Sequence, residues 1–302
     1  MTTTPTGEQY EIERDGTSAV VTEVGATLRA FQVDGRPCLE AFGADDLVEA
    51  GRGQVLMPFP NRVAGGRYTW DGEPQQLPIT EVERGNAIHG FVRSMGWRPR
   101  SHERDRITLG LTLHPQQGYP FVLDLALTYA VSGGRLTVEH SARNVGRSAA
   151  PFGAGFHPYL TAGTPTIDSN LLQLPAASYF RTDERLIPTG KAGVDGTPLD
   201  FRRPRRIGDA RLDTGFTDVQ RDGDGWARVV LTADGRRVEL LLGRGYEFVQ
   251  VFTGDPLPPP RRRTGLAVEP YTCAADAFNN GLGLTTLAPG AETSGAWGIS
   301  VG

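Results

Sequence analysis

The sequence predicts an all-β fold, and two observations support this prediction. The dipeptide Asp-Gly, the strongest short-range signal of a β-hairpin turn, occurs seven times, at positions 15, 34, 71, 195, 222, 224 and 234. No window of a dozen residues holds an apolar stripe at helical spacing without an interrupting glycine or proline. Many short strands joined by turns are typical of a large antiparallel sandwich or barrel.

Three hairpins can be placed along the chain. The clearest joins residues 121–131 to residues 136–142 through a Ser-Gly-Gly turn, and large apolar side chains alternate along both strands. The side chains predicted to share one face of its first strand are Leu123, Leu125, Leu127 and Tyr129. The other two hairpins pair residues 66–70 with 77–79 and residues 229–232 with 238–242.

Two segments read as irregular loops. Residues 188–206 and residues 254–263 lack a strand or helix period and are rich in proline, glycine and arginine. Within the second, residues 256–260 predict a short polyproline II stretch that serves as an exposed connector.

Composition limits the classes of function. The chain has 302 residues, with 31 Lys and Arg against 35 Asp and Glu. This balance gives a net charge of −4, which argues against a nucleic-acid partner and against a highly charged disordered chain. We expect residues 1–302 to form a single β-sandwich domain.

The cysteines, the N-terminal residues and the length of the apolar stretches bear on compartment and membrane association. The two cysteines, Cys38 and Cys273, cannot form a disulfide framework for a domain of this size. They are expected to be free thiols in a reducing compartment. The first fifteen residues lack the features of a secretory signal, and no apolar stretch is long enough to span a bilayer. We therefore expect a cytoplasmic protein without a membrane partner.

Two of the five histidines stand in unusual surroundings. His89 lies in Asn-Ala-Ile-His-Gly-Phe, and His157 lies between small residues and Pro158. Pro158 cannot donate a ladder hydrogen bond, so a strand is expected to end or bulge there. On the residues alone, a buried structural histidine is the simpler interpretation, and a functional one stays open.

The remaining histidines give no signal of a metal site. His102, His114 and His140 occupy polar or strand-edge contexts without a distinctive partner. No histidine pair has metal-ligand spacing with a carboxylate beside it. The sequence therefore predicts neither a metal nor a cofactor.

Glu269 and Arg62 are candidates of a different kind. Glu269 is the only carboxylate in an apolar, strand-like run, where desolvation would raise its pKa and suit it to general-base work. Arg62 follows Asn61 in a loop pinned by two prolines and two glycines, and a rigid guanidinium can donate to several sugar hydroxyls. The alternatives are an edge-strand glutamate facing water and a loop arginine paired with a surface carboxylate.

Taken together, these segments resemble the aldose 1-epimerase (galactose mutarotase) family. The resemblance runs in order through most of the chain and ends in a Leu-x-Pro-Gly strand entry at residues 287–290. The segments that carry it are Asn61-Arg62, Ile88-His89-Gly90, Phe156-His157-Pro158-Tyr159-Leu160, Leu212-Asp213 with Phe216, and Glu269 with Asp276-Ala277-Phe278-Asn279.

The resemblance implies a large antiparallel β-supersandwich that interconverts the α and β anomers of a free monosaccharide without a cofactor. It implies that Glu269 is the general base at the C1 hydroxyl and that His157 is the general acid at the ring oxygen. By the same resemblance, His89 would hydrogen-bond near the ring oxygen, while Asn61, Arg62 and Asp213 would hold sugar hydroxyls. Proximity of opposite charges would then favour an ionised Glu269 beside a protonated His157.

The chain also departs from the family pattern. Thr214-Gly215 replaces the usual residues after the sugar-binding aspartate, which leaves Asp218 as a fallback for Asp213, and Tyr271 replaces a common glutamine. These features look closer to the bacterial aldose 1-epimerase-like branch, which includes proteins acting on sulfoquinovose.

Two alternative functions stay open. One is a mutarotase for an anionic sugar, a hexose 6-phosphate or sulfoquinovose, with the arginines of residues 202–206 and 261–263 as a cationic rim. The other is a non-catalytic carbohydrate-binding module on the same fold. The sequence is compatible with a monomer or a homodimer.

Overall fold

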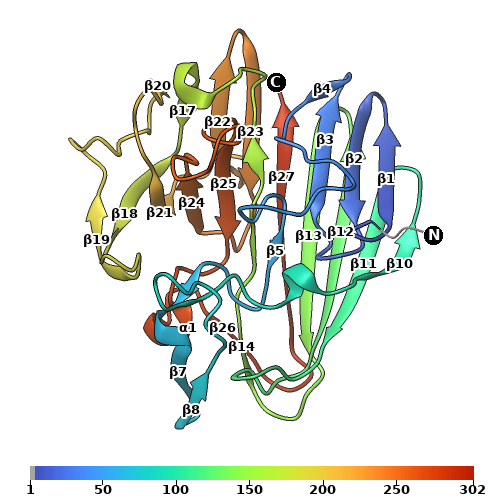
Figure 1. Cartoon of the computed structure of the whole chain (residues 1–302), viewed down its shortest axis with the longest axis vertical. Coiled ribbons are helices and arrows are strands. Elements are labelled where there is room, and N and C mark those ends of the chain that lie inside the picture. Colours follow the sequence, from blue (N-terminus) through green and yellow to red (C-terminus); the bar gives the residue numbers. More distant parts are fainter. Residues whose placement is uncertain (1–3) are drawn as a thin grey trace.

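The computed structural model describes residues 4–302, and every strand pairing within that range is antiparallel. Two large sheets dominate (Figure 1). The nine-stranded sheet runs in the order β10 (Arg98–His102), β11 (Arg106–Leu113), β12 (Leu123–Ser132), β13 (Arg135–Asn144), β27 (Glu292–Val301), β23 (Arg236–Leu242), β22 (Ala227–Ala233), β17 (Leu171–Gln173) and β20 (Arg205–Arg206). The all-β prediction and the supersandwich architecture are confirmed.

The second sheet has eight strands and carries two of the candidate residues, Asp213 and Glu269. Its order is β19 (Pro188–Gly193), β18 (Ala176–Thr182), β21 (Asp213–Val219), β24 (Phe248–Phe252), β25 (Leu266–Tyr271), β15 (Gly155–Phe156) and β5 (Val55–Leu56), with β16 (Tyr159–Leu160) also paired to β25. Because β25 lies inside this sheet, a side chain on it can meet groups from several neighbouring elements.

Smaller elements complete the structure. An N-terminal sheet of four strands lies against β11 and β12 at one side of the molecule (Figure 1). Its strands are β1 (Gln9–Arg14), β2 (Thr17–Thr22), β3 (Leu28–Val33) and β4 (Arg36–Pro37). The short pairs are β6 (Arg62–Val63) with β9 (Ala87–Ile88), β7 (Arg67–Trp70) with β8 (Glu73–Gln76), and β14 (Ala150–Phe152) with β26 (Thr285–Leu287).

Helical structure in the described range is limited to short turns. The one α-helix there, α1, covers Ala277–Asn280, and three 3-10 turns cover Ala64–Gly66, Val92–Ser94 and Ile167–Ser169. No helix in residues 4–302 is long and apolar enough to cross a membrane.

The predicted hairpins β12–β13 and β22–β23 are present, and β7 turns back at Asp71-Gly72 as predicted, but its partner β8 is Glu73–Gln76 and not residues 77–79. The alternating leucines of β12 are fully buried, as the period of two predicts. They belong to one core cluster that also contains Phe31 of the N-terminal sheet and Phe156 of the eight-stranded sheet.

Three local predictions need correction. Residues 188–206 are not one irregular loop, because β19 and β20 lie within them. Turns at residues 255–256 and 259–260 interrupt the segment, so residues 256–260 are not a continuous polyproline II stretch, although the prolines are exposed. His140 is a core residue whose ring lies 2.7 Å from the Tyr246 hydroxyl, which its alternating strand position could have indicated. Residues 254–263 do lack regular structure, and both cysteines are free and buried.

Candidate active site

A buried carboxyl and a buried imidazole form the centre of the site. Glu269 lies in β25 and is 2% exposed, and His157 is 6% exposed. His157 Nε2 lies 3.5 Å from Glu269 Oε1. His157 reaches this position because the chain leaves regular pairing between β15 and β16, at His157 and Pro158, where the proline predicts an interruption.

Burial controls the protonation of this pair. Desolvation raises the pKa of Glu269 well above its ordinary value, although a hydrogen bond from the Tyr271 hydroxyl to Oε2 opposes the shift. Desolvation lowers the pKa of His157 to about 3. Burial thus favours the neutral form of both partners in the unliganded protein and opposes the ionised pair that attraction between opposite charges would favour.

The imidazole of His157 is packed on several sides. Its ring stacks on Tyr159 with centroids 5.1 Å apart, and the Arg52 guanidinium lies over the Tyr159 ring. Gly51 approaches so closely that a Cβ there would lie 2.6 Å from His157 Cδ2. Among the residues that the structure describes, His157 Nδ1 has no hydrogen-bond partner, so protonating the ring would leave a buried N–H unsatisfied.

His89 stands beside His157, with ring centroids 5.6 Å apart. Its backbone has a positive φ of 64° between β9 and Gly90. The backbone N–H of Asn61 donates to His89 Nδ1 at 3.2 Å. Burial lowers the pKa of the His89 ring well below its ordinary value. A neutral ring that accepts at Nδ1 carries its proton on Nε2, so His89 can donate a hydrogen bond from that nitrogen.

The loop that bears Asn61 and Arg62 is held at both ends. Arg62 donates from Nε and Nη2 to the Glu81 carboxylate at 2.9–3.1 Å. The Asp276 amide donates to the Arg62 carbonyl, and Asp276 Oδ1 accepts from the Ala64 amide. Arg62 is thus paired with a carboxylate that is largely buried and not at the surface, and its remaining donors face Asn61 and Asp213.

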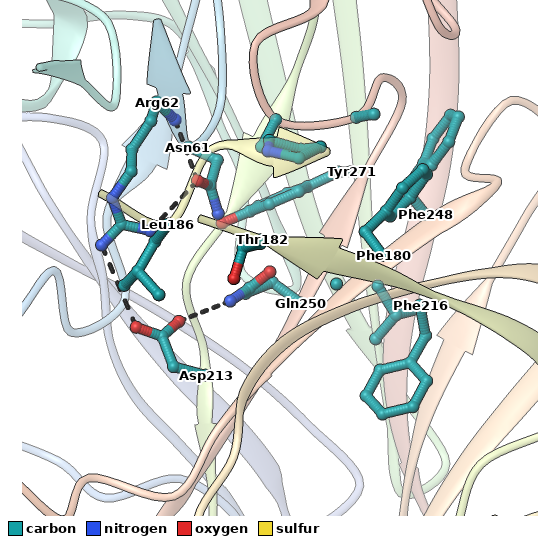
Figure 2. A pocket seen from close by; sticks show the side chains of 15 residues that line it. Asn61, Arg62, Phe180, Thr182, Leu186, Asp213, Phe216, Phe248, Gln250 and Tyr271 are labelled. Carbon is teal, nitrogen blue, oxygen red and sulfur yellow. Dashed lines mark hydrogen bonds and ion pairs between the residues drawn. The ribbon is translucent and has the colours of Figure 1, made fainter. Parts of the chain in front are cut away.

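Asp213 and Gln250 form the opposite wall. Gln250 Nε2 donates to Asp213 Oδ1 at 2.5 Å, and Asp213 Oδ2 lies 3.9 Å from Arg62 Nη2 (Figure 2). Gln250 and Glu269 are direct partners across β24 and β25, so their side chains share one face of the sheet. Arg62, Asp213, Gln250 and Tyr271 line a small hollow that aromatic side chains close on its far side.

A second hollow continues along the same strand face. Phe248 and Gln250 of β24 line the first hollow, and Phe252, two residues further on, lines the second together with His89 and Gly51. Gln250 stands opposite Glu269, and Gly51 packs on His157. Glu269 is thus adjacent to a residue of the first hollow and His157 to a residue of the second, although neither side chain lines a hollow itself.

All six predicted site residues come together here: Asn61, Arg62, His89, His157, Asp213 and Glu269. The fallback Asp218 does not, because it is about half exposed and pairs with Lys191. Gln250 was not predicted, and its only sequence signal is one amide in the apolar run Phe-Val-Gln-Val-Phe. Tyr271 was predicted only as a departure from the family pattern, whereas its hydroxyl donates to Glu269.

The site can be compared with known proteins. The model of the aldose 1-epimerase family matches residues 8–300. The chain belongs to this family. The uncharacterized protein YihR of Escherichia coli K12 is 33% identical over 94% of this chain and 90% of its own length. The galactose mutarotase of Homo sapiens is 30% identical over 67% of this chain and 63% of its own length.

Solved structures of the aldose 1-epimerase type share the fold. The GalM/aldose epimerase homologue from C. elegans superimposes with a TM-score of 0.87 at 18% identity and covers 98% of both chains. The galactose 1-epimerase of Lactobacillus acidophilus superimposes with a TM-score of 0.81 at 23% identity and covers 97% of this chain and 93% of that one.

Proposed function

We propose that the protein is an aldose 1-epimerase that interconverts the α and β anomers of a free aldose by general acid–base ring opening. The observation that carries this proposal is the buried pair of one carboxyl and one imidazole, 3.5 Å apart, beside a wall of hydroxyl-binding groups. Ring opening requires one proton to leave and one to arrive at two oxygens bonded to the same carbon, and such a pair offers both functions.

The reaction conserves one proton in the pair. Ionised Glu269 takes the proton of the C1 hydroxyl while protonated His157 gives its proton to the ring oxygen. The bond between C1 and the ring oxygen breaks, and an open-chain aldehyde forms. Glu269 is then protonated and His157 neutral, which is the state that burial favours in the unliganded protein. Rotation about C1–C2 and reclosure by the reverse transfers produce the other anomer.

The surrounding residues hold the sugar during these steps. His89 donates from Nε2 toward the ring oxygen, and Arg62, Asn61 and Asp213 bind hydroxyl groups. Because Arg62 and Asp213 are fixed by Glu81 and Gln250, the sugar meets a preorganised surface that needs little reordering on binding. No metal or cofactor takes part in these steps.

Exchange NMR on free aldoses tests the proposal, because it measures anomer interconversion directly. We expect the wild-type protein to exceed the spontaneous rate, and Glu269→Gln and His157→Asn each to lose at least about 10²-fold. Asp218→Asn, at an exposed carboxylate outside the site, serves as the control and is expected to retain activity. Sugar binding without rate enhancement by the wild-type protein would instead support a non-catalytic carbohydrate-binding module.

A further inference from the structure

A turn that joins two strands of the eight-stranded sheet is anchored on a distant loop. Residues 183–187 connect β18 to β19, and we name this turn the strap. Arg185 donates from Nε to the Arg84 carbonyl at 2.8 Å and from Nη2 to the Gly85 carbonyl at 2.7 Å. Its Nη2 also donates to Asn86 Oδ1 at 2.9 Å. One side chain thus holds the strap on a segment that lies 99 to 101 residues away in sequence.

A buried amide connects the strap to the wall of the site. Asn86 is fully buried, and its Nδ2 donates to the Arg185 carbonyl at 3.1 Å and to Glu81 Oε2 at 2.9 Å. Glu81 is the carboxylate that holds Arg62. The strap and the Arg62 guanidinium therefore belong to one chain of hydrogen bonds, in which each buried polar group depends on its neighbours for a partner.

The tip of the strap, Leu186, lines the first hollow together with Arg62 and Asp213 (Figure 2). Its backbone has a φ of 60°, a region that leucine adopts only at a cost. The Asp183 carboxylate maintains this conformation, since its Oδ1 accepts from the backbone N–H groups on either side of Leu186, both at 2.9 Å. The turn therefore holds an apolar side chain among groups proposed to bind sugar hydroxyls.

The size of the first hollow limits what this edge of a sugar can carry. The hollow is small, and Thr182 and Pro188 of the same hairpin line it together with Leu186. It accommodates hydroxyl groups of one ring, whereas a second ring joined to such a hydroxyl would collide with the strap. The reducing end of an oligosaccharide has the same anomeric centre as a monosaccharide, so the acid–base pair cannot distinguish the two. Discrimination by size therefore requires a contact at the hydroxyl edge of the sugar, where Leu186 stands.

We propose that Leu186 and Arg185 determine specificity by closing the first hollow, so that the enzyme acts on monosaccharides and excludes the reducing ends of oligosaccharides. This inference rests on the proposed function and adds a limit on the size of the substrate. Leu186 makes the steric contact, and Arg185 is a positioning residue that acts through the strap.

Substrate comparison tests the proposal. Exchange NMR would measure kcat/KM for glucose and for kojibiose, nigerose and maltose, in which a second glucose is attached at O2, O3 or O4 of the reducing unit. We expect at least one disaccharide to fall below glucose by about 10- to 100-fold, the range that a contact in a binding pocket achieves. The position of the rejected linkage identifies the hydroxyl that enters the first hollow. Equal values for glucose and all three disaccharides overturn the proposal while leaving the mutarotase function standing.

Variants of the strap make the comparison specific. Leu186→Gly is expected to raise the ratio of disaccharide to glucose kcat/KM by about 10-fold for the rejected linkage, whereas Leu186→Asn keeps most of the bulk and is expected to keep most of the discrimination. Both residues suit the positive φ, so the fold is expected to survive. Arg185→Ala should raise the same ratio by releasing the strap, and Arg185→Lys should do so less. Arg181→Ala, at an exposed position of the same hairpin, is the control and should leave the ratio unchanged. An unchanged ratio in Leu186→Gly refutes the steric role.

A binding measurement keeps the inference independent of turnover. In calorimetry, the wild-type protein is expected to bind glucose more tightly than the disaccharide with the rejected linkage, and Leu186→Gly to reduce that difference by about 10-fold. If no sugar were interconverted above the spontaneous rate, the proposed function would fail, and this titration would still decide whether the strap limits the size of the ligand. Equal affinity of the wild-type protein for glucose and all three disaccharides would contradict the size limit.

Discussion

Replacing Gly51 by alanine should move the proposed acid while leaving the fold intact. A Cβ at position 51 would lie 2.6 Å from His157 Cδ2 and 3.1 Å from Nε2, whereas ordinary contact begins at 3.4 Å. The imidazole would therefore have to shift by about 0.8 Å, and a misplacement of about 1 Å can cost about 10²-fold in rate. We expect kcat in exchange NMR to fall by about that factor.

Backbone strain must be separated from displacement of the ring. Gly51 has φ +73°, where alanine costs about 1 kcal/mol. Gly35 has φ +72°, and a Cβ added there would meet no atom within 4 Å, so Gly35→Ala carries the strain without the clash. Both variants are expected to lower Tm by about 2–4 °C in thermal denaturation. Full activity in Gly51→Ala, with Tm lowered as in the control, would refute the reasoning that Gly51 fixes the imidazole.

Three further predictions concern the charges of the site. The pH profile of kcat/KM should show no ionisation near the ordinary histidine pKa of about 6.5. Activity should be lost only as the pH falls toward the His157 pKa of about 3 or rises through the raised pKa of Glu269. A loss of activity on the acid side near pH 6.5 would contradict this, since about 6.5 is the ordinary histidine value. Tyr271→Phe removes a donor that stabilises ionised Glu269, so the pKa of Glu269 should rise further. In pH-dependent kinetics the basic limb should move to higher pH, and kcat should fall about 10-fold. A basic limb at lower pH would show that the hydroxyl does not act on the carboxylate. Asp213→Asn should raise KM about 10-fold with a smaller change in kcat, and saturation curves that show the reverse would remove it from substrate binding.

Much of the fold could be predicted from local signals. Asp-Gly turns and alternating leucines located the β12–β13 and β22–β23 hairpins, because turn chemistry and side-chain period are properties of a few adjacent residues. The strand β19 was not predicted because apolar and polar residues do not alternate along Pro188–Gly193. This segment is a strand because it pairs with β18 at the edge of the sheet. Tertiary context thus overrode a weak local preference.

The site residues also divide into those with a local sequence signal and those without one. Residues with a distinctive sequence context, such as His157 before its proline and Asn61-Arg62 between prolines, could be singled out and are together in the structure. Gly51 and Gln250 could not, because each acquires its role from a neighbour distant in the chain. The upward shift of the Glu269 pKa also depends on its degree of burial, which is fixed only once the sheets have packed.

The contact between Asp276 and the Asn61-Arg62 loop has a consequence for how the protein acquires its activity. The hydrogen bond from the Ala64 amide to Asp276 spans 212 residues of sequence. The loop that bears Asn61 and Arg62 is therefore fixed only after the segment around Asp276 has folded, and contacts of such long range form slowly. Recovery of sugar binding during refolding should accordingly coincide with the folding of the C-terminal strands.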